Sequence, residues 1–261
     1  MAGAATVEKA LDLLFHLHEA GASLGLSEIA RDLDLPKSSC HRLLSSLLAR
    51  DIVERDDAGR YRPGLALLSL GLGAQAREPV VAAARPLLEA EAVALGETVF
   101  LVGRRRGVVR VLDKSEGTGV LRAAPAVGDV IPADVTAAGK LYRVLDPDPE
   151  SEDAARVATA REARSIARNG YATNRDEWIE GLSVLAVPIW QGTPPAPPAL
   201  TATLALGAAS RRFDGLGEAR IAERLLAAAE RVAHRLGPGE TSRGTRSQSW
   251  QPRPAHQEKT R

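Results

Sequence analysis

Residues 24–62 constrain the fold of this 261-residue chain more than any other stretch. The segment SEIARDLDL, which begins at Ser27, repeats apolar residues at helical spacing, and serine is a residue type that caps helix N-termini well. Pro36 then ends this helix and starts a second one, PKSSCHRLLSSLLAR, whose apolar residues recur at i, i+3, i+4, i+7 and i+8. Two short helices separated by such a break predict a helix-turn-helix.

The outer side of the second helix carries short polar side chains and cations. A helix that enters the major groove of DNA needs small residues on its outer face and hydrogen-bond donors in its first turns. Serine hydroxyls can donate, Arg42 can bind guanine through two hydrogen bonds, and Lys37 suits a phosphate. The candidate DNA-binding residues of this helix are Lys37, Ser38, Ser39, His41, Arg42 and Ser45.

A basic hairpin is predicted directly after these helices. In IVERDDAGRYRPG, two short strands flank a turn at residues 56–59, and Arg60 and Arg62 lie on the returning strand. We expect this hairpin to be the wing of a winged helix-turn-helix, with Arg60 on the DNA backbone or in the minor groove. Helix pairs with polar outer faces also occur in domains that never bind nucleic acid, but the coincidence of a capped helix, a small outer face and a basic hairpin favours DNA.

These residues resemble the IclR family of bacterial transcription regulators. In the first half, the matching segments are TVEKAL from Thr6, LSEIARDLDLPKSSCHRLLSSL from Leu26, VER and GRYRPG. In the second half, they are GETV, TAAGK, GYA and GLSVLAVP. The resemblance covers roughly residues 6–236. It implies an α+β fold class with a winged helix-turn-helix, a linker helix and a GAF-like effector domain that contains an antiparallel sheet.

The predicted domain boundaries follow from this resemblance and from shifts in composition. Residues 1–64 form the winged helix-turn-helix DNA-binding domain, 65–78 a linker helix, 79–237 the GAF-like effector-binding domain and 238–261 a disordered tail. A helix that joins a DNA-binding head to another domain commonly carries a dimer contact, although it can equally pack inside its own domain.

Two further expectations concern packing in the N-terminal domain. The first helix is expected to begin at a Thr6 cap and to turn one apolar face toward the core. That face would be formed by Val7, Ala10, Leu11, Leu14, Leu17 and His18. Cys40, the only cysteine of the chain, falls on the apolar stripe of the second helix of the helix-turn-helix, so core packing is favoured over redox sensing.

The second half of the chain mixes strands with segregated helices, which predicts an α+β domain with a largely antiparallel sheet. A hairpin is expected from residues 98–102 and 107–112, with three arginines solvated at its tip. Short apolar runs at 120–121, 130–131, 184–190 and 200–206 predict further strands, and helices are expected at 136–145, 152–167 and 216–236. The proline-rich segment 193–198 is expected to be a stiff surface loop rather than a partner ligand.

Composition excludes several kinds of active site. Histidine occurs only at positions 16, 18, 41, 234 and 256, so residues 96–210 contain neither His nor Cys. A Ser-His-Asp or Cys-His nucleophile and a His/Cys zinc site are therefore impossible in that region. No glycine-rich nucleotide-binding motif is present either. We expect no enzyme activity, no cofactor and no metal.

Composition also bears on the compartment. A single cysteine cannot form an internal disulfide, and no signal peptide or run of 18 apolar residues is visible. These features favour a cytoplasmic protein without a membrane span.

The resemblance also implies an effector site. In this family, the effector is held by residues at the positions that match Ala137, Ala138, Asn174, Val184, Leu204 and Leu206. Members that bind small oxoacids have an acid, a cysteine and two serines at the last four positions, whereas this chain has neutral or apolar residues there. Because leucine cannot donate a hydrogen bond to a carboxylate, we expect an aromatic or lipid-like effector, or none. A shift of the strand by one residue would instead turn Thr201 and Thr203 inward.

Charge gives the last constraint on function. The formal net charge is +1, and residues 1–65 contain eight Lys and Arg against ten Asp and Glu. This balance argues against strong non-specific DNA binding and favours a local basic face whose affinity is raised by pairing two heads. The favoured function is a homodimeric or homotetrameric regulator that binds a palindromic double-stranded DNA operator. The alternative is a ligand-binding or enzymatic protein whose N-terminal domain mediates protein contacts.

Overall fold

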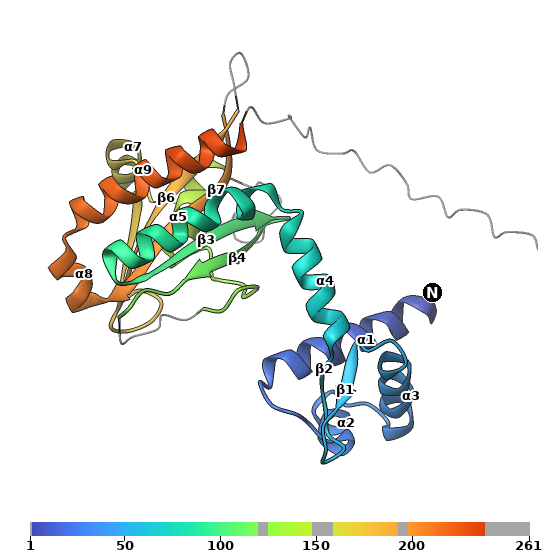
Figure 1. Cartoon of the computed structure of the whole chain (residues 1–261). Helices are drawn as coiled ribbons and strands as arrows, with labels where there is room; N and C mark the ends of the chain where they lie inside the picture. Colours follow the sequence, from blue (N-terminus) through green and yellow to red (C-terminus); the bar gives the residue numbers. More distant parts are fainter. Residues whose placement is uncertain (1, 120–124, 148–158, 193–197, 238–261) are drawn as a thin grey trace, which may run out of the picture. The chain divides into compact units, whose positions relative to one another are not determined.

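The chain folds into two compact units, Met1–Glu78 and Pro79–Arg261 (Figure 1). The structure is a computed structural model, and it describes residues 2–119, 125–147, 159–192 and 198–237. Each unit has its own hydrophobic core. The first unit contains the helix-turn-helix together with the helix that follows the wing, and the second contains the α+β domain.

The N-terminal unit is a winged helix-turn-helix followed by one further helix. Its core is formed by one face of the first helix, the inner sides of the next two helices and the hairpin. In chain order, the elements are α1 (Ala2–Glu19), α2 (Leu26–Asp32), α3 (Lys37–Leu48), β1 (Val53–Arg55), β2 (Tyr61–Pro63) and α4 (Leu65–Ala76).

The start of α2 differs from the expectation. The helix begins at Leu26 with Gly25 as its N-cap, so Ser27 lies inside the first turn and does not cap it. The Glu28 carboxylate accepts a hydrogen bond from the Gly25 N–H at 2.7 Å, which satisfies one of the donors that a helix N-terminus leaves free. The break before α3 is confirmed, because Pro36 is the N-cap of that helix.

The buried face of α1 also differs from the expectation. The helix starts at Ala2, so Thr6 is an interior residue, and the buried side chains are Leu13 and Leu17. Three other apolar side chains, spaced four residues apart, remain exposed on the surface. They are Val7, Leu11 and Phe15.

The wing is confirmed as an antiparallel hairpin, in which Val53 pairs with Pro63 and Arg55 with Tyr61. The Asp56 carboxylate accepts hydrogen bonds from the Ala58 and Arg60 N–H groups at 3.0 and 2.8 Å, as aspartate commonly does in turns. The backbone hydrogen bonds to Asp56 lower the pKa of its carboxyl group. The turn is therefore fixed by local chemistry that is visible in the sequence.

The C-terminal unit is built around a five-stranded antiparallel sheet with the strand order β4-β3-β7-β6-β5. The strands are β3 (Thr98–Arg105), β4 (Val108–Ser115), β5 (Ala172–Arg175), β6 (Leu182–Gln191) and β7 (Ala199–Ala209). The helices are α5 (Pro79–Leu95), α6 (Ala137–Leu145), α7 (Ala160–Asn169), α8 (Ser210–Leu216) and α9 (Glu218–Leu236). The α+β class with an antiparallel sheet is thereby confirmed.

Helices cover both faces of this sheet, so the unit has two hydrophobic cores. On one face, α5 and α9 pack over the alternating apolar residues of β3, β6 and β7 (Figure 1). On the other face, α6 and α7 pack over the strand residues that alternate with these and point the opposite way, such as Phe100 and Ala205. Glu91 of α5 is buried between the two long helices, where it accepts hydrogen bonds from Arg224 at 2.7 Å and Arg231 at 3.0 Å.

Several boundaries in this unit differ from the expectations. The β3–β4 hairpin turns at Arg106 and Gly107, which both have positive φ, so the strands are longer and the turn is tighter than expected. Arg104 is not solvated: it pairs with Asp146 and lies over the Tyr142 ring. Strand β5 and helix α8 had no counterpart among the expected elements, whereas α9 corresponds to the last expected helix and begins two residues later, after Gly217.

Some expectations lie outside the described residues. These are the run at 120–121, the first part of the helix expected at 152–167, all but the last residue of the segment 193–198, and the tail 238–261. Cys40, by contrast, is described and fully buried, and burial raises the pKa of its thiol, so it is a core residue.

Candidate DNA-binding surface and effector pocket

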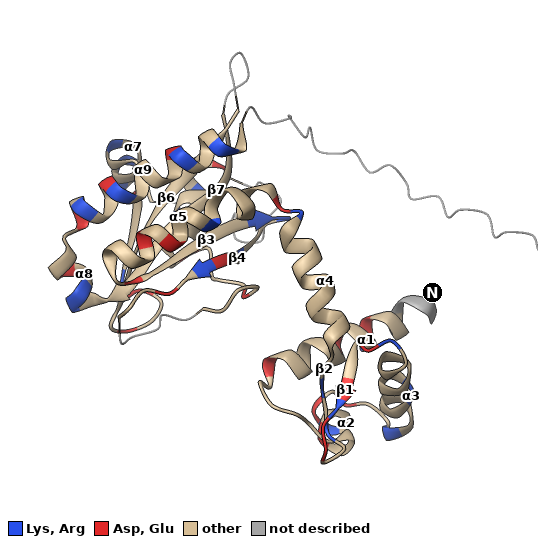
Figure 2. Ribbon diagram, viewed as in Figure 1, with Lys and Arg blue, Asp and Glu red and all other residues tan. Residues whose placement is uncertain are grey.

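The outer face of α3 presents the side chains expected to contact DNA. Lys37, Ser38, His41, Arg42 and Ser45 are all exposed, and the opposite side of the helix buries Cys40 and Leu44. At about 100° per residue, Ser38, Arg42 and Ser45 lie on one side, with His41 next to them. Figure 2 shows that the basic end of α3 is its start, where Lys37 lies.

The basic side chains on this face are available to a ligand. Within the part of the chain that the structure describes, Lys37, His41 and Arg42 form no ion pair. Most other arginines of this unit are engaged: Arg31 contacts Asp32, Arg55 contacts Tyr61 and Arg62 contacts Glu54. A helix with exposed serines and unpaired cations can donate hydrogen bonds both to phosphates and to base edges.

Two of the expected DNA-binding residues are placed differently. Ser39 is half-buried on the flank of α3. Arg60 is half-exposed but is bound within its own domain, because its Nε donates to the Ser23 carbonyl oxygen at 2.9 Å and its Nη2 to Glu28 at 2.9 Å. Since Glu28 also accepts from the Gly25 N–H, Arg60 links the wing to the start of α2. The structure thus gives Arg60 an internal role that the sequence did not indicate.

A pocket lies on the α6 side of the sheet in the C-terminal unit. Its walls enclose about 440 Å³, counted out to the open mouth, and are mostly apolar. The lining residues are Phe100, Val102, Val111, Pro125, Ile131, Thr136, Ala137, Ala138, Asn174, Trp178, Leu182, Val184, Ala205 and Gly207.

The structure brings four of the six expected effector residues to this pocket: Ala137, Ala138, Asn174 and Val184. The expectation that Leu204 and Leu206 face the same space is wrong. They lie on the opposite face of β7, fully buried in the core that α5 and α9 cover.

The reason is the phase of β7. Thr203 pairs with Val102, and Ala205 with Phe100, and directly paired residues of antiparallel strands point to the same face. The strand therefore turns its odd-numbered residues toward α6, which is the one-residue shift that the sequence left open. Thr203 is fully buried on this face, and its Oγ1 has no hydrogen-bond partner among the described atoms.

The start of α6 supplies the polar groups of the pocket. Thr136 caps the helix: its Oγ1 accepts from the Gly139 N–H at 3.1 Å and donates to the Pro132 carbonyl oxygen at 2.6 Å. The first N–H groups of a helix have no partner within the helix, so the amides of Ala137 and Ala138 can donate to a ligand. An acceptor group of a bound molecule would be stabilised here.

Gly139 allows the backbone of Ala133 to pack closely against the first turn of α6. A Cβ atom at position 139 would lie 2.3 Å from the Ala133 carbonyl oxygen and 2.4 Å from the Ala133 Cα. Only glycine avoids this clash with backbone atoms. The sequence TAAGK therefore combines a helix cap, two small pocket residues and a required glycine.

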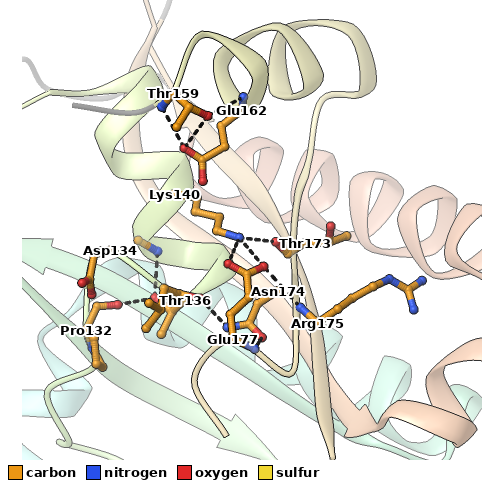
Figure 3. Close-up of polar contacts among 12 residues, drawn as sticks. Pro132, Asp134, Thr136, Lys140, Thr159, Glu162, Thr173, Asn174, Arg175 and Glu177 are labelled. Carbon is orange, nitrogen blue, oxygen red and sulfur yellow. Dashed lines mark hydrogen bonds and ion pairs between the residues drawn. The ribbon is translucent and has the colours of Figure 1, made fainter. Parts of the chain in front are cut away.

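A polar network joins α6 to β5 beside the pocket (Figure 3). Lys140 is buried, and its Nζ donates to both carboxylate oxygens of Glu177 at 2.6 Å and to the Thr173 carbonyl oxygen at 3.0 Å. The Asn174 side chain donates to the Val135 carbonyl oxygen, and its Oδ1 accepts from the Glu177 N–H at 3.4 Å. The network thus fixes the residues on one side of the pocket relative to α6.

Sequence reasoning missed most of the apolar wall. Phe100 and Val102 alternate along β3 and could have been found from the period of two, once the paired strand was known. Trp178 carried no such signal, because it follows β5 in a polar segment.

No helix within the described residues is both long and apolar enough to cross a membrane.

Comparisons with known proteins assign the two units. Residues 6–57 match the family model of the IclR helix-turn-helix domain, and residues 73–234 match that of the bacterial transcriptional regulator IclR C-terminal domain. The chain is 26% identical over 207 residues to the HTH-type transcriptional repressor AllR of Escherichia coli K12, covering 72% of this chain and 75% of AllR.

Solved structures show the same fold. An IclR transcriptional regulator from Alicyclobacillus acidocaldarius is 25% identical, with a TM-score of 0.73 over 89% of this chain and 98% of that one. The Thermotoga maritima IclR is 23% identical, with a TM-score of 0.71 over the same shares. An IclR homologue from Microbacterium hydrocarbonoxydans, solved in complex with 4-hydroxybenzoate, is 19% identical, with a TM-score of 0.73 over 88% and 98%. The second family match spans more than half of the chain, so this protein belongs to the IclR family of DNA-binding transcriptional regulators and is not an enzyme.

Proposed function

We propose that this protein binds a palindromic DNA operator as a homodimer or homotetramer and that a small-molecule effector modulates its binding. The observation that carries the DNA part is the outer face of α3, where small hydroxyl side chains flank Arg42, which has no ion pair among the described residues. Arg42 reads a guanine in the major groove, and Lys37 at the helix start contacts a phosphate. The remaining contacts of the helix are made by Ser38, Ser39, His41 and Ser45. In the wing, Arg60 contacts the DNA backbone or the minor groove.

Self-association through α4 supports the dimer. This helix contains no charged residue (Figure 2). None of its side chains is buried, and four of its leucines are exposed. They are Leu65, Leu68, Leu70 and Leu72. A helix that is apolar all round needs a partner to cover it. A second copy of the same helix supplies that partner and places two recognition helices on successive half-sites.

The pocket beside α6 is the proposed effector site. Its apolar walls favour an aromatic or lipid-like molecule, and the free amides at the start of α6 favour one with an acceptor group at its end. The 4-hydroxybenzoate bound to the homologue from Microbacterium hydrocarbonoxydans is a molecule of this type.

Because the DNA of a bacterium lies in its cytoplasm, we place the protein there.

Fluorescence anisotropy with labelled duplexes from the promoters of neighbouring genes tests the DNA proposal. We expect salt-sensitive binding, uniform weakening by Lys37→Ala, and a loss of about 1–3 kcal/mol with relaxed preference at one base pair for Arg42→Ala. Arg220→Ala, which removes an exposed arginine from α9, is the matched control and should bind like the wild type. If Arg42→Ala keeps the sequence preference intact, α3 does not read bases. No salt-sensitive binding at micromolar protein would favour the alternative, in which the N-terminal unit mediates protein contacts.

A further inference from the structure

The interior of the effector pocket is narrow in this structure. It has room for only about three water molecules, whereas an aromatic ring needs several times that space. A ligand can therefore enter only if part of the wall moves. Most of the wall consists of strands hydrogen-bonded into the sheet and of the first turn of α6, which are costly to displace.

Outside the strands and the start of α6, the wall consists of Pro125, Ile131 and Trp178, and Trp178 is the largest of these side chains and can move at low cost. It belongs to the loop of residues 176–181 between β5 and β6, in which every residue except Trp178 is exposed. The loop is fixed at its base, where the Asp176 N–H donates to the Leu182 carbonyl oxygen at 3.1 Å and the Gly181 N–H to the Asp176 carboxylate at 2.8 Å. Its middle is fixed by Glu177 and by the Ile179 carbonyl oxygen, which accepts from the Leu182 N–H at 3.1 Å.

Glu177 is bound to a cation that cannot easily leave. The side chain of Lys140 is 9% exposed, and that of Glu177 is 42% exposed. A buried ammonium group needs partners, so Lys140 of α6 remains next to the Thr173 carbonyl oxygen of β5. Glu177 can exchange its contact with Lys140 for water (Figure 3). When the ion pair breaks, Glu177 therefore moves away with the loop, while Lys140 stays in place.

We propose that the Lys140–Glu177 ion pair is a latch that holds Trp178 over the effector pocket. The loop opens when Glu177 leaves Lys140, the effector enters, and Trp178 closes over it. Lys140 and Glu177 are positioning residues, because they act through Trp178 and do not line the pocket themselves. The proposal rests on the effector site proposed above. It predicts that the pair sets the rate of ligand entry by setting the fraction of molecules with an open loop.

The first test needs no ligand. In the full-length protein with Trp190→Phe and Trp250→Phe, Trp178 is the only tryptophan, and acrylamide quenching reports its exposure. We expect Glu177→Gln to raise the quenching rate constant clearly, since the amide loses the charge that binds Lys140. Glu180→Gln is the matched control in the same loop and should leave quenching unchanged. Unchanged quenching in Glu177→Gln would overturn the latch.

The second test uses 4-hydroxybenzoate as the probe, followed by stopped-flow fluorescence of Trp178. Glu177→Gln should raise the association rate constant about fivefold, while its thermal midpoint stays close to that of the control. Lys140→Met should act in the same direction, and Glu177→Gln remains informative if Lys140→Met fails to fold. Increased quenching without probe binding would support the latch and reject this class of effector. Binding of the probe with unchanged rates in Glu177→Gln would support the effector site and overturn the latch.

Discussion

Arg60 illustrates how a cation expected at a DNA surface can be used within its own domain. It contacts Ser23 and Glu28, which lie on either side of the start of α2, from the end of the wing turn. The side chains of the Arg60–Glu28 pair are 44% and 41% exposed, so solvent weakens the charge interaction, and the hydrogen bond to the Ser23 carbonyl oxygen adds to it.

We therefore expect Arg60→Ala to lower the free energy of unfolding of the N-terminal unit by about 1 kcal/mol. Chemical denaturation followed by circular dichroism would measure this change. Arg62→Ala is the matched control, because Arg62 pairs with Glu54 across the same hairpin at the surface, and its effect should stay within about 0.5 kcal/mol. Equal effects of the two substitutions would show that Arg60 does not join the wing to α2.

Asp113 offers a pH-dependent test at the same scale. Its carboxyl group is buried on β4; Oδ1 accepts from Arg85 at 2.8 Å, and Oδ2 has no hydrogen-bond partner among the described atoms. Burial raises the pKa of this group, and the charge of Arg85 only partly opposes the shift. A carboxyl group with a raised pKa binds its proton more tightly in the folded state. Its contribution to stability is therefore present below the unfolded pKa and is lost as the pH rises through the folded pKa.

Asp113→Asn cannot lose this contribution, because the amide does not ionise. As the pH rises from about 3 to 7, we therefore expect Asp113→Asn to gain stability relative to the wild type, measured as the difference between their unfolding free energies. Urea denaturation at several pH values measures it. Asp57→Asn, at an exposed position of the wing turn, should show no such trend. A difference that is independent of pH would contradict the burial of a charged Asp113.

At the scale of elements, the sequence predicted what local chemistry determines. The break at Pro36, the small outer face of α3 and the Asp56 turn each depend on a few neighbouring residues, and all three are observed. The expected face of α1 is only partly observed: Leu14 and Leu17 contact the core, whereas Val7 is exposed. An apolar period shows which residues could be buried, but not what covers them.

The phase of β7 could not be predicted, because the strand is buried on both faces. In ALTATLALGAA, small and apolar residues occupy both phases, so alternation does not identify the side that faces α6. The phase is set by pairing with β3 and β6, and the pairing with β6 shifts at Ile189 and Trp190. Non-local register therefore decided that Leu204 and Leu206 lie away from the pocket.

The first turn of α6 carries a prediction about packing. Gly139→Ala places a methyl group against the backbone of Ala133, which cannot rotate away as a side chain could. We expect it to lower the unfolding free energy of the C-terminal unit by about 2–3 kcal/mol. Gly215→Ala in α8 is the matched control: its Cβ meets nothing within 4 Å, and it should be neutral or stabilising. Thermal unfolding measures both, and a neutral Gly139→Ala would mean that the segment at Ala133 is not packed on α6.

At the scale of the whole molecule, the proposed linkage of two DNA-binding heads would explain how a weakly charged head binds specifically. The N-terminal unit has no excess of positive charge, so each half-site alone supplies limited affinity. Joining two heads makes binding to the second half-site intramolecular and multiplies the affinity for the full operator. The linkage would come from the exposed leucines of α4.

Leu68→Gln combined with Leu72→Gln tests this linkage, because both side chains are more than half exposed and lie one turn apart. We expect the variant to fold, to sediment as a smaller species, and to bind a full operator at least about tenfold more weakly while binding an isolated half-site like the wild type. Val93→Gln removes an even more exposed apolar residue from α5 and should change neither property. A double variant that keeps the wild-type mass would place the interface elsewhere. If the double variant sediments as a monomer yet binds the full operator as tightly as the wild type, a single head supplies the specificity. The palindrome of the operator would then have no physical role.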